Sequence, residues 1–109
     1  MTPEGYVVNA IRKAVRAAGG EARKCKWVGR RGCPDWFVML GGQHWFIEAK
    51  APGRRPEPHQ AREHRCMREI GGCVVWVVDD AGKVSEAVED MVQHGGDPQT
   101  VGDFWGFNK

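Results

Sequence analysis

The first twenty residues carry a helical pattern of apolar positions. These positions recur at three- and four-residue steps, the spacing of the buried stripe of an amphipathic helix. They are Val7, Val8, Ile11, Ala14, Val15 and Ala18. Thr2 can cap the start of this helix, Pro3 suits its first turn, and Gly19-Gly20 can end it. The pattern therefore predicts a helix that buries one face and turns its basic residues mainly to the others.

Three strand-like runs follow, with a very short loop between the last two. They are predicted at residues 22–28, 35–40 and 43–50. The Gly41-Gly42 pair between the second and third runs is typical of a two-residue hairpin loop, because both glycines can adopt positive φ. In a hairpin with this loop Leu40 pairs with Gln43, so the numbers of opposed residues sum to 83.

The second half of the chain alternates helix, strand and helix. A helix is predicted from about Pro58 to Ile70, a short buried strand from Val74 to Val78, and a last helix from about Val84 to His94. The stretch from residue 50 to residue 73 is long enough for a right-handed crossover, so the last strand can lie parallel to the third. The order α-β-β-β-α-β-α predicts an α/β fold with one mixed β-sheet flanked by helices.

Length and composition fit one small domain. The chain has 109 residues, of which 41% are hydrophobic, enough for a modest core. It has no apolar run near the roughly 18 residues that cross a bilayer and no signal-peptide pattern, so a cytoplasmic location is expected. Residues 1–94 are expected to form the domain. Residues 95–109, which contain Phe104, Trp105 and Phe107, are expected to form an irregular tail that packs on the core or on a dimer partner.

Charge is distributed unevenly along the chain. The net charge is only +2, but residues 11–31 hold eight basic residues against one acid, and residues 79–103 hold seven acids against one lysine. Such segregation favours one basic face that meets a polyanion. On charge alone, a nucleic acid partner and an ordinary solvated surface are about equally supported. The candidate phosphate contacts are Arg12, Lys13, Arg16, Arg23, Lys24, Arg30, Arg31, Arg54 and Arg55.

The hairpin register brings two carboxylates together. Asp35 stands opposite Glu48, because their numbers also sum to 83. Opposed side chains share a face of the sheet, with Cβ atoms about 4.5 to 5.5 Å apart. Two carboxylates so close should repel each other and raise one pKa, whereas a divalent ion between them removes the repulsion. Their oxygens are the hard ligands that Mg²⁺ prefers, so the register predicts a Mg²⁺ site.

A lysine shares the face of these carboxylates. Glu48 and Lys50 are two residues apart on one strand, so both side chains point the same way, and the backbone carbonyl of Ala49 between them could reach the ion. An ammonium group there can orient an attacking water or stabilise charge on a phosphate. An exposed strand with a surface salt bridge would carry the same Glu-x-Lys pattern. The opposed Asp35, the apolar neighbours and the flanking basic loops favour the metal site.

A further carboxylate lies on the first helix. Glu4 precedes Val7 and Val8 by three and four residues, so it projects toward the buried side of the helix. It is either a first-turn residue favoured by the helix dipole, or a group that points at something positive. Helical position alone favours the first interpretation.

The residues that carry this chemistry also resemble a known family. Gly32-Cys33-Pro34-Asp35, then a hairpin, then Phe46-Ile47-Glu48-Ala49-Lys50, then Gln60 at the start of a helix are similar to the virus-type replication-repair nuclease (VRR-NUC) domain. That family belongs to the PD-(D/E)xK nuclease superfamily. The resemblance extends from Glu4 to about Asp79, nearly the whole chain, and it implies a restriction-endonuclease-like core.

The resemblance implies a role for each of these residues. It implies that Asp35, Glu48 and the carbonyl of Ala49 bind Mg²⁺ or Mn²⁺, that Lys50 is the catalytic lysine, that Gln60 lies beside the site and that Glu4 faces it as a further candidate ligand. One departure is that polar residues occupy positions 62–65, where a bulky aromatic residue is expected. This leaves the packing of that helix open.

Cysteine and histidine residues indicate no further site. The four cysteines, at positions 25, 33, 66 and 73, lack C-x-x-C spacing, so free thiols are expected. A zinc site from His59, His64 and Cys66 is a weaker alternative, because its spacing matches no structural zinc module. Among the histidines, His59 beside Gln60 is expected to lie nearest to the site, in a peripheral position.

The expected reaction is hydrolysis of a DNA phosphodiester bond, with Lys50 orienting the attacking water and Mg²⁺ stabilising the developing charge. Whether a second ion binds is open. Stand-alone members of the family resemble Holliday-junction resolvases and act as homodimers. This implies cleavage of branched DNA in repair or recombination, and a phage or prophage source within a bacterial cytoplasm. No membrane partner or small-molecule cofactor is expected.

Three rival functions are left open by the sequence. One is a DNA-binding module that does not cut. Another is a sequence-specific endonuclease on the same fold, although the chain shows no set of residues that would read bases. The third is a toxin-like RNase.

Overall fold

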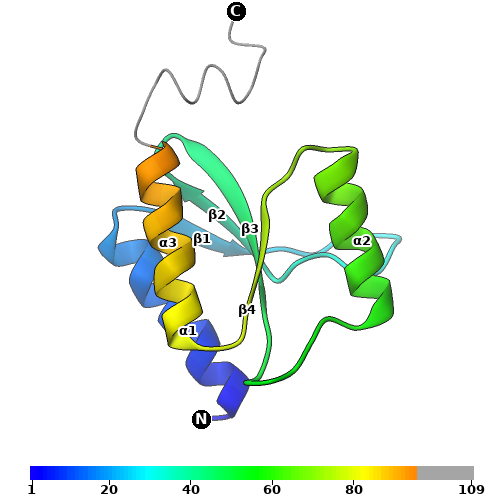
Figure 1. The fold of residues 1–109 in the computed structure, drawn as a ribbon, viewed down its shortest axis with the longest axis horizontal. Helices are drawn as coiled ribbons and strands as arrows, with labels where there is room; N and C mark the ends of the chain where they lie inside the picture. The colour runs from blue at the N-terminus through cyan, green and yellow to red at the C-terminus, as the bar shows by residue number, and fades with distance from the viewer. Residues whose placement is uncertain (96–109) are drawn as a thin grey trace, which may run out of the picture.

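A four-stranded sheet forms the centre of the molecule, with helices on both of its faces (Figure 1). The computed structural model describes residues 1–95. In chain order its elements are α1 (Pro3–Ala17), β1 (Glu21–Lys24), β2 (Trp36–Leu40), β3 (Gln43–Ala49), α2 (Pro58–Glu69), β4 (Val75–Val78) and α3 (Ala81–Gly95). The expected α/β class and element order are confirmed. The expected aromatic tail lies outside the described residues.

The strands follow one another across the sheet in the order β1-β2-β3-β4. The first three are antiparallel neighbours, and Leu40 pairs with Gln43 as the Gly-Gly loop predicts. Gly41 and Gly42 have φ values of 68° and 82°, which a glycine adopts without strain. The last strand, β4, lies parallel to β3, so α2 is the crossover between them.

The two faces of the sheet are covered by different helices. On one face α1 and α3 pack together over the sheet, and on the other α2 lies alone (Figure 1). The α1/α3 face carries the larger apolar cluster, built on Trp36, Val38, Trp45 and Ile47 of the sheet. The α2 face carries a smaller one, made of Phe46, Met67 and Val75 with partly buried neighbours.

Two element boundaries differ from expectation. The first strand ends at Lys24 rather than near residue 28, because the chain then turns toward α2. Trp27 packs edge-on against Phe46, with ring centroids 6.4 Å apart, and its indole N–H donates to Glu63 at 2.7 Å. The last helix begins at Ala81, before the predicted Val84. A carboxylate oxygen of Asp80 caps it by accepting a hydrogen bond from the backbone N–H of Lys83. In residues 1–95 no helix is long and apolar enough to cross a membrane.

Candidate active site

The predicted carboxylates meet where β2 begins and β3 ends. Asp35 directly precedes β2, Glu48 is the penultimate residue of β3, and Lys50 follows that strand. One oxygen of Asp35 accepts a hydrogen bond of 2.9 Å from the backbone N–H of Ala49. The Asp35 side chain therefore extends the hairpin beyond its last strand pair, Trp36 with Ile47. This contact holds it beside the Glu48–Lys50 segment.

Glu48 is almost fully buried, at 1% exposure, and Gln60 of α2 ties it to Lys50. The amide nitrogen of Gln60 donates to Glu48 Oε2 at 3.0 Å, and its oxygen accepts from Lys50 Nζ at 2.7 Å. The Lys50 ammonium lies 3.6 Å from the same Glu48 oxygen. The Gln60 oxygen also accepts the N–H of Glu57 at 2.8 Å, which closes the first turn of α2. These contacts make one connected network.

The charge at Asp35 is disfavoured in the folded protein. Burial raises the pKa of its carboxyl above the usual value, and repulsion from Glu48 and Glu4 acts in the same direction. The Ala49 N–H and the charge of Lys24 oppose this rise in pKa. Repulsion between the paired carboxylates was expected from the sequence, but burial is the larger cause.

Glu4 and two of the predicted basic residues lie beside Lys50. Glu4, Lys50, Arg54 and Arg55 line a cavity of about 270 Å³ together with Ala51 and Glu57. The Glu4 side chain is exposed in the first turn of α1, as expected for a first-turn residue favoured by the helix dipole. It lies close to the site, since it lines this cavity together with Lys50.

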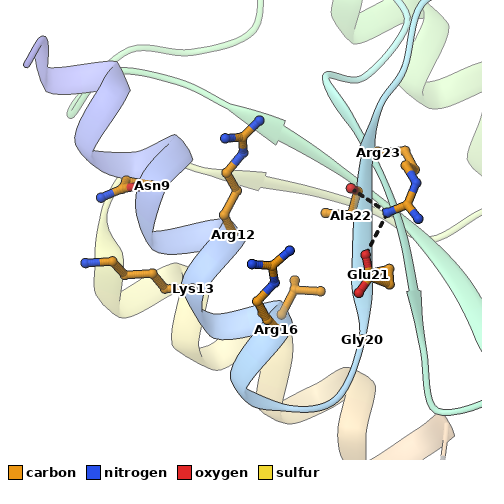
Figure 2. Close-up of a pocket in the computed structure, with 9 residues that line it drawn as sticks. Asn9, Arg12, Lys13, Arg16, Gly20, Glu21, Ala22 and Arg23 are labelled. Atoms are coloured by element: carbon orange, nitrogen blue, oxygen red, sulfur yellow. Dashed lines mark hydrogen bonds and ion pairs between the residues drawn. The ribbon is translucent and has the colours of Figure 1, made fainter.

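The other predicted basic residues fall into two further groups. Arg30 and Arg31 lie against α2 in a cavity shared with Arg62, and Arg30 pairs with Glu63 at 2.9 Å. The second group lines a groove of about 430 Å³ between α1 and β1 (Figure 2). Its basic members are Arg12, Lys13, Arg16 and Arg23. Lys24 does not line the groove, but it and Arg12 both approach the ring of Trp36, at 5.2 and 5.1 Å.

The structure adds a histidine that was not expected at the site. His64, not His59, is the histidine nearest to the carboxylates, with its Nε2 atom 3.7 Å from Glu48 Oε1. His59 instead approaches Arg31, at 3.4 Å. A signal for His64 was present, because positions 60, 63, 64 and 67 have the i, i+3, i+4, i+7 spacing of one helix face. In α2 that face holds Gln60, Glu63, His64 and Met67.

A glycine brings the loop before Asp35 close to α2. Gly32 has a φ of 97°, and a Cβ atom on it would lie 2.7 Å from the Cβ of Glu63 and 2.8 Å from the carbonyl oxygen of His59. No other residue fits this approach without moving α2. Among the polar residues at positions 62–65, which depart from the family pattern, Glu63 makes this close approach to Gly32. The helix packs through Glu63 and His64, which are both buried.

One cysteine next to the site, Cys33, is held in its thiol form. Cys33 lies two residues before Asp35, and its Sγ atom is 3.1 Å from that of Cys25. Burial and this contact raise the pKa of Cys33 to about 12. All four cysteines are free, as expected.

The donor atoms at the site suit a hard cation. The Asp35 and Glu48 carboxylates lie together, and Glu48 Oε1 is buried with no hydrogen-bond partner within residues 1–95. Mg²⁺ is commonly held by one or two carboxylates and completes its shell with water and substrate oxygens. Over the same residues no three His, Cys, Asp or Glu side chains are placed to hold a metal. The zinc alternative of His59, His64 and Cys66 therefore has no support.

Known proteins resemble the chain in both sequence and fold. No family model matches it. A phage protein named "Putative nuclease p44", from Acyrthosiphon pisum secondary endosymbiont phage 1, is 42% identical over 73 residues, which cover 66% of this chain and 74% of that protein. A solved structure described as "VRR_NUC domain" matches with a TM-score of 0.70 at 36% identity, covering 86% of this chain and 98% of the other.

Proposed function

The chain belongs to the VRR-NUC nuclease family, and from this premise we propose that it is a Mg²⁺-dependent endonuclease that hydrolyses DNA phosphodiester bonds. The observation that carries the proposal is the network of Glu48, Lys50 and Gln60 with Asp35 beside it. Burying Glu48 and raising the pKa of Asp35 both cost free energy. Selection for stability alone does not explain this loss of free energy. A metal-dependent nuclease explains it, because it needs these carboxylates at the site.

The residues that would hold the metal are Asp35, Glu48 and the backbone carbonyl of Ala49. In a β-strand the N–H and C=O of one residue point to the same side. The Ala49 N–H points to Asp35, so its carbonyl faces that side too. Mg²⁺ bound there would supply positive charge to the scissile phosphate and acidify a water molecule. Glu4 is the further candidate ligand.

Lys50 would act on the water or the phosphate directly. Its ammonium has three N–H donors, of which Gln60 accepts one at 2.7 Å. The side chain lines the cavity that also holds Arg54 and Arg55, so the remaining donors are available to a phosphate oxygen or a water there. Gln60 fixes the ammonium, and it also fixes Glu48. One residue of α2 thus sets the distance between the proposed metal ligand and the proposed catalytic lysine.

The groove between α1 and β1 would hold the DNA backbone beyond the cut. Arg12, Lys13 and Arg16 form no ion pair with an acid in residues 1–95, so their charges are available. In Figure 2 the Arg12 and Arg16 side chains extend from α1 on the side that faces β1. Arg16 lies twelve residues beyond Glu4, about 18 Å along the helix. At about 3.4 Å per phosphate along one strand, this length matches about five phosphates.

Branched DNA and a homodimer complete the proposal. One chain carries one such site, so paired cuts in two strands of a junction need two copies, and a two-fold axis would place them symmetrically. A module that binds DNA without cutting uses the same basic groove, but it gives no reason to bury Glu48 next to Lys50 and Gln60.

Cleavage of labelled DNA tests this function. A four-way junction and a linear duplex of matched sequence are incubated with the protein in Mg²⁺ or in EDTA. We expect cleavage in Mg²⁺ alone, symmetric paired nicks in the junction and slower cutting of the duplex. Lys50→Ala should abolish cleavage, while Lys83→Gln, on α3, should not change it. Binding of both DNAs without cleavage in Mg²⁺ or Mn²⁺ would support the module instead. Equal cutting of both would leave a general endonuclease.

A further inference from the structure

Two buried polar atoms face each other at the site without a hydrogen-bond partner in residues 1–95. They are Glu48 Oε1 and His64 Nε2, which lie 3.7 Å apart on side chains of residues that are each 1% exposed. Buried polar atoms are almost always paired in folded proteins, because an unpaired one keeps the full cost of leaving water. The separation is longer than a hydrogen bond, but it is within ion-pair distance.

One face of α2 supplies both contacts to the Glu48 carboxylate. Gln60 and His64 are four residues apart, so their side chains leave the same face of the helix. Gln60 bonds to Oε2, while His64 lies against Oε1. A small shift of the imidazole or of the carboxylate would bring the second contact into hydrogen-bond range. The carboxylate is therefore placed between two α2 side chains, one for each oxygen.

We propose that His64 is a positioning residue, which fixes the orientation of the Glu48 carboxylate through an Nε2–H that faces Oε1. This inference rests on the proposed role of Glu48 as a metal ligand and adds the residue that orients it. A carboxylate oxygen has two lone pairs, so Oε1 can accept from His64 and still bind a cation. Polar neighbours that orient a ligand in this way commonly change metal affinity by about 10- to 100-fold.

A role as simple core filling does not account for the residue. His64 lies one helical turn before Met67, which packs in the small apolar cluster with Phe46 and Val75. An apolar side chain of similar volume would serve that cluster without an unpaired nitrogen. Contact between His64 Nε2 and the Glu48 carboxylate explains why a histidine occupies this position.

Metal affinity distinguishes a His64 that positions Glu48 from a His64 that only fills space in the core. Mn²⁺ binding is measured by electron paramagnetic resonance on the wild type, His64→Phe and His64→Gln, with His94→Phe on α3 as the control. Gln keeps an N–H donor at a similar reach, and Phe keeps the volume but no donor. We expect the dissociation constant to rise at least about tenfold in His64→Phe and by less than about threefold in His64→Gln and His94→Phe. His64→Met replaces the Phe variant if that variant does not fold.

Thermal unfolding of the metal-free protein gives a second readout, independent of cleavage. We compare the wild type, His64→Phe, Glu48→Gln and the double variant. The fall in Tm caused by His64→Phe should be at least halved on the Glu48→Gln background, because the charge it would leave uncompensated is gone. Additive Tm shifts together with unchanged Mn²⁺ affinity would overturn the proposal. Coupled shifts and weaker Mn²⁺ binding in a protein that cuts no DNA would instead refute the nuclease function and keep His64 in its role.

Discussion

The two faces of the sheet are built from opposite kinds of residue, although they share the same strands. Ile47 and Glu48 are neighbours on β3, and both are almost fully buried. Ile47 points into the apolar cluster under α1 and α3, whereas Glu48 points toward α2, where His64 and Glu63 are also buried. The first face is a hydrophobic core. The second is a polar interior closed by one helix and a small apolar cluster.

The difference shows how a chain of this size can hold buried charge. Apolar burial stabilises by about 25 cal/mol per Å², and the α1/α3 face concentrates it in fourteen buried residues. The attraction between buried ionic groups rarely offsets the free energy lost on desolvation. The α2 face therefore contributes less to folding stability than its buried area suggests. One face can therefore carry the stability while the other keeps the geometry needed for chemistry.

The largest expected effect comes from Glu48→Gln on the polar face. The amide keeps the shape of the side chain, but it removes the charge that would bind the cation. DNA cleavage per folded molecule should fall at least about 100-fold, while the free energy of unfolding changes far less than for a core truncation. Rates on a labelled junction and urea denaturation measure the two quantities. A variant that cuts at the wild-type rate would contradict the assignment.

Ile47→Ala makes the opposite change one residue away. Truncating a fully buried isoleucine should lower the free energy of unfolding by about 2 to 5 kcal/mol. Cleavage per folded molecule should stay within about threefold of the wild type, since the Ile47 side chain points away from α2. Urea denaturation and cleavage below the unfolding transition test this. If both variants lose activity and stability together, the two faces do not divide their roles in this way.

The apolar face was predictable from the sequence, and much of the polar face was not. The Gly41-Gly42 loop fixed the hairpin register, and with it the approach of Asp35 to Glu48. Glu63 was unpredictable as a buried residue, because its partner Trp27 lies 36 positions earlier in the chain. Helical spacing places Glu63 and His64 on one face of α2 with Met67, but it does not mark that face as buried, because most of its side chains are polar. The first strand was predicted too long because of the same long-range contact. Trp27 leaves the sheet to reach Glu63 on α2, so the strand ends at Lys24.

The pH dependence of stability should reveal the partly buried carboxyl group of Asp35. Its pKa is raised in the folded protein, so the folded state holds the proton more tightly than the unfolded state does. Stability from this group is full below the ordinary carboxyl pKa of 3.8 and is lost as the pH rises through the raised value. Asp35→Asn, whose side-chain oxygen can still accept the Ala49 N–H, should remove that loss. Metal-free denaturation of both proteins from about pH 3 upward tests this, and parallel curves would contradict it.

The smallest effect is expected at the groove between α1 and β1, which the proposal gives to DNA but not to chemistry. Arg12→Gln with Arg16→Gln should weaken binding to duplex DNA, and the log–log salt dependence should become shallower by about 0.9 for each phosphate that the variant no longer binds. Fluorescence anisotropy in a Lys50→Ala background measures this without cleavage. Lys83→Gln should leave the slope unchanged. An unchanged salt dependence in the double variant would show that DNA does not bind in the groove.

The central claim is that the carboxylates on the α2 face support metal-dependent cleavage of DNA. Nicking of a supercoiled plasmid by the wild type and by Asp35→Asn tests it most directly, in Mg²⁺ and in EDTA, at equal concentrations of folded protein. We predict that the wild type nicks in Mg²⁺ and stops in EDTA, and that Asp35→Asn is at least about 100-fold slower while being as stable as the wild type or more so. Nicking by Asp35→Asn at the wild-type rate would contradict the account.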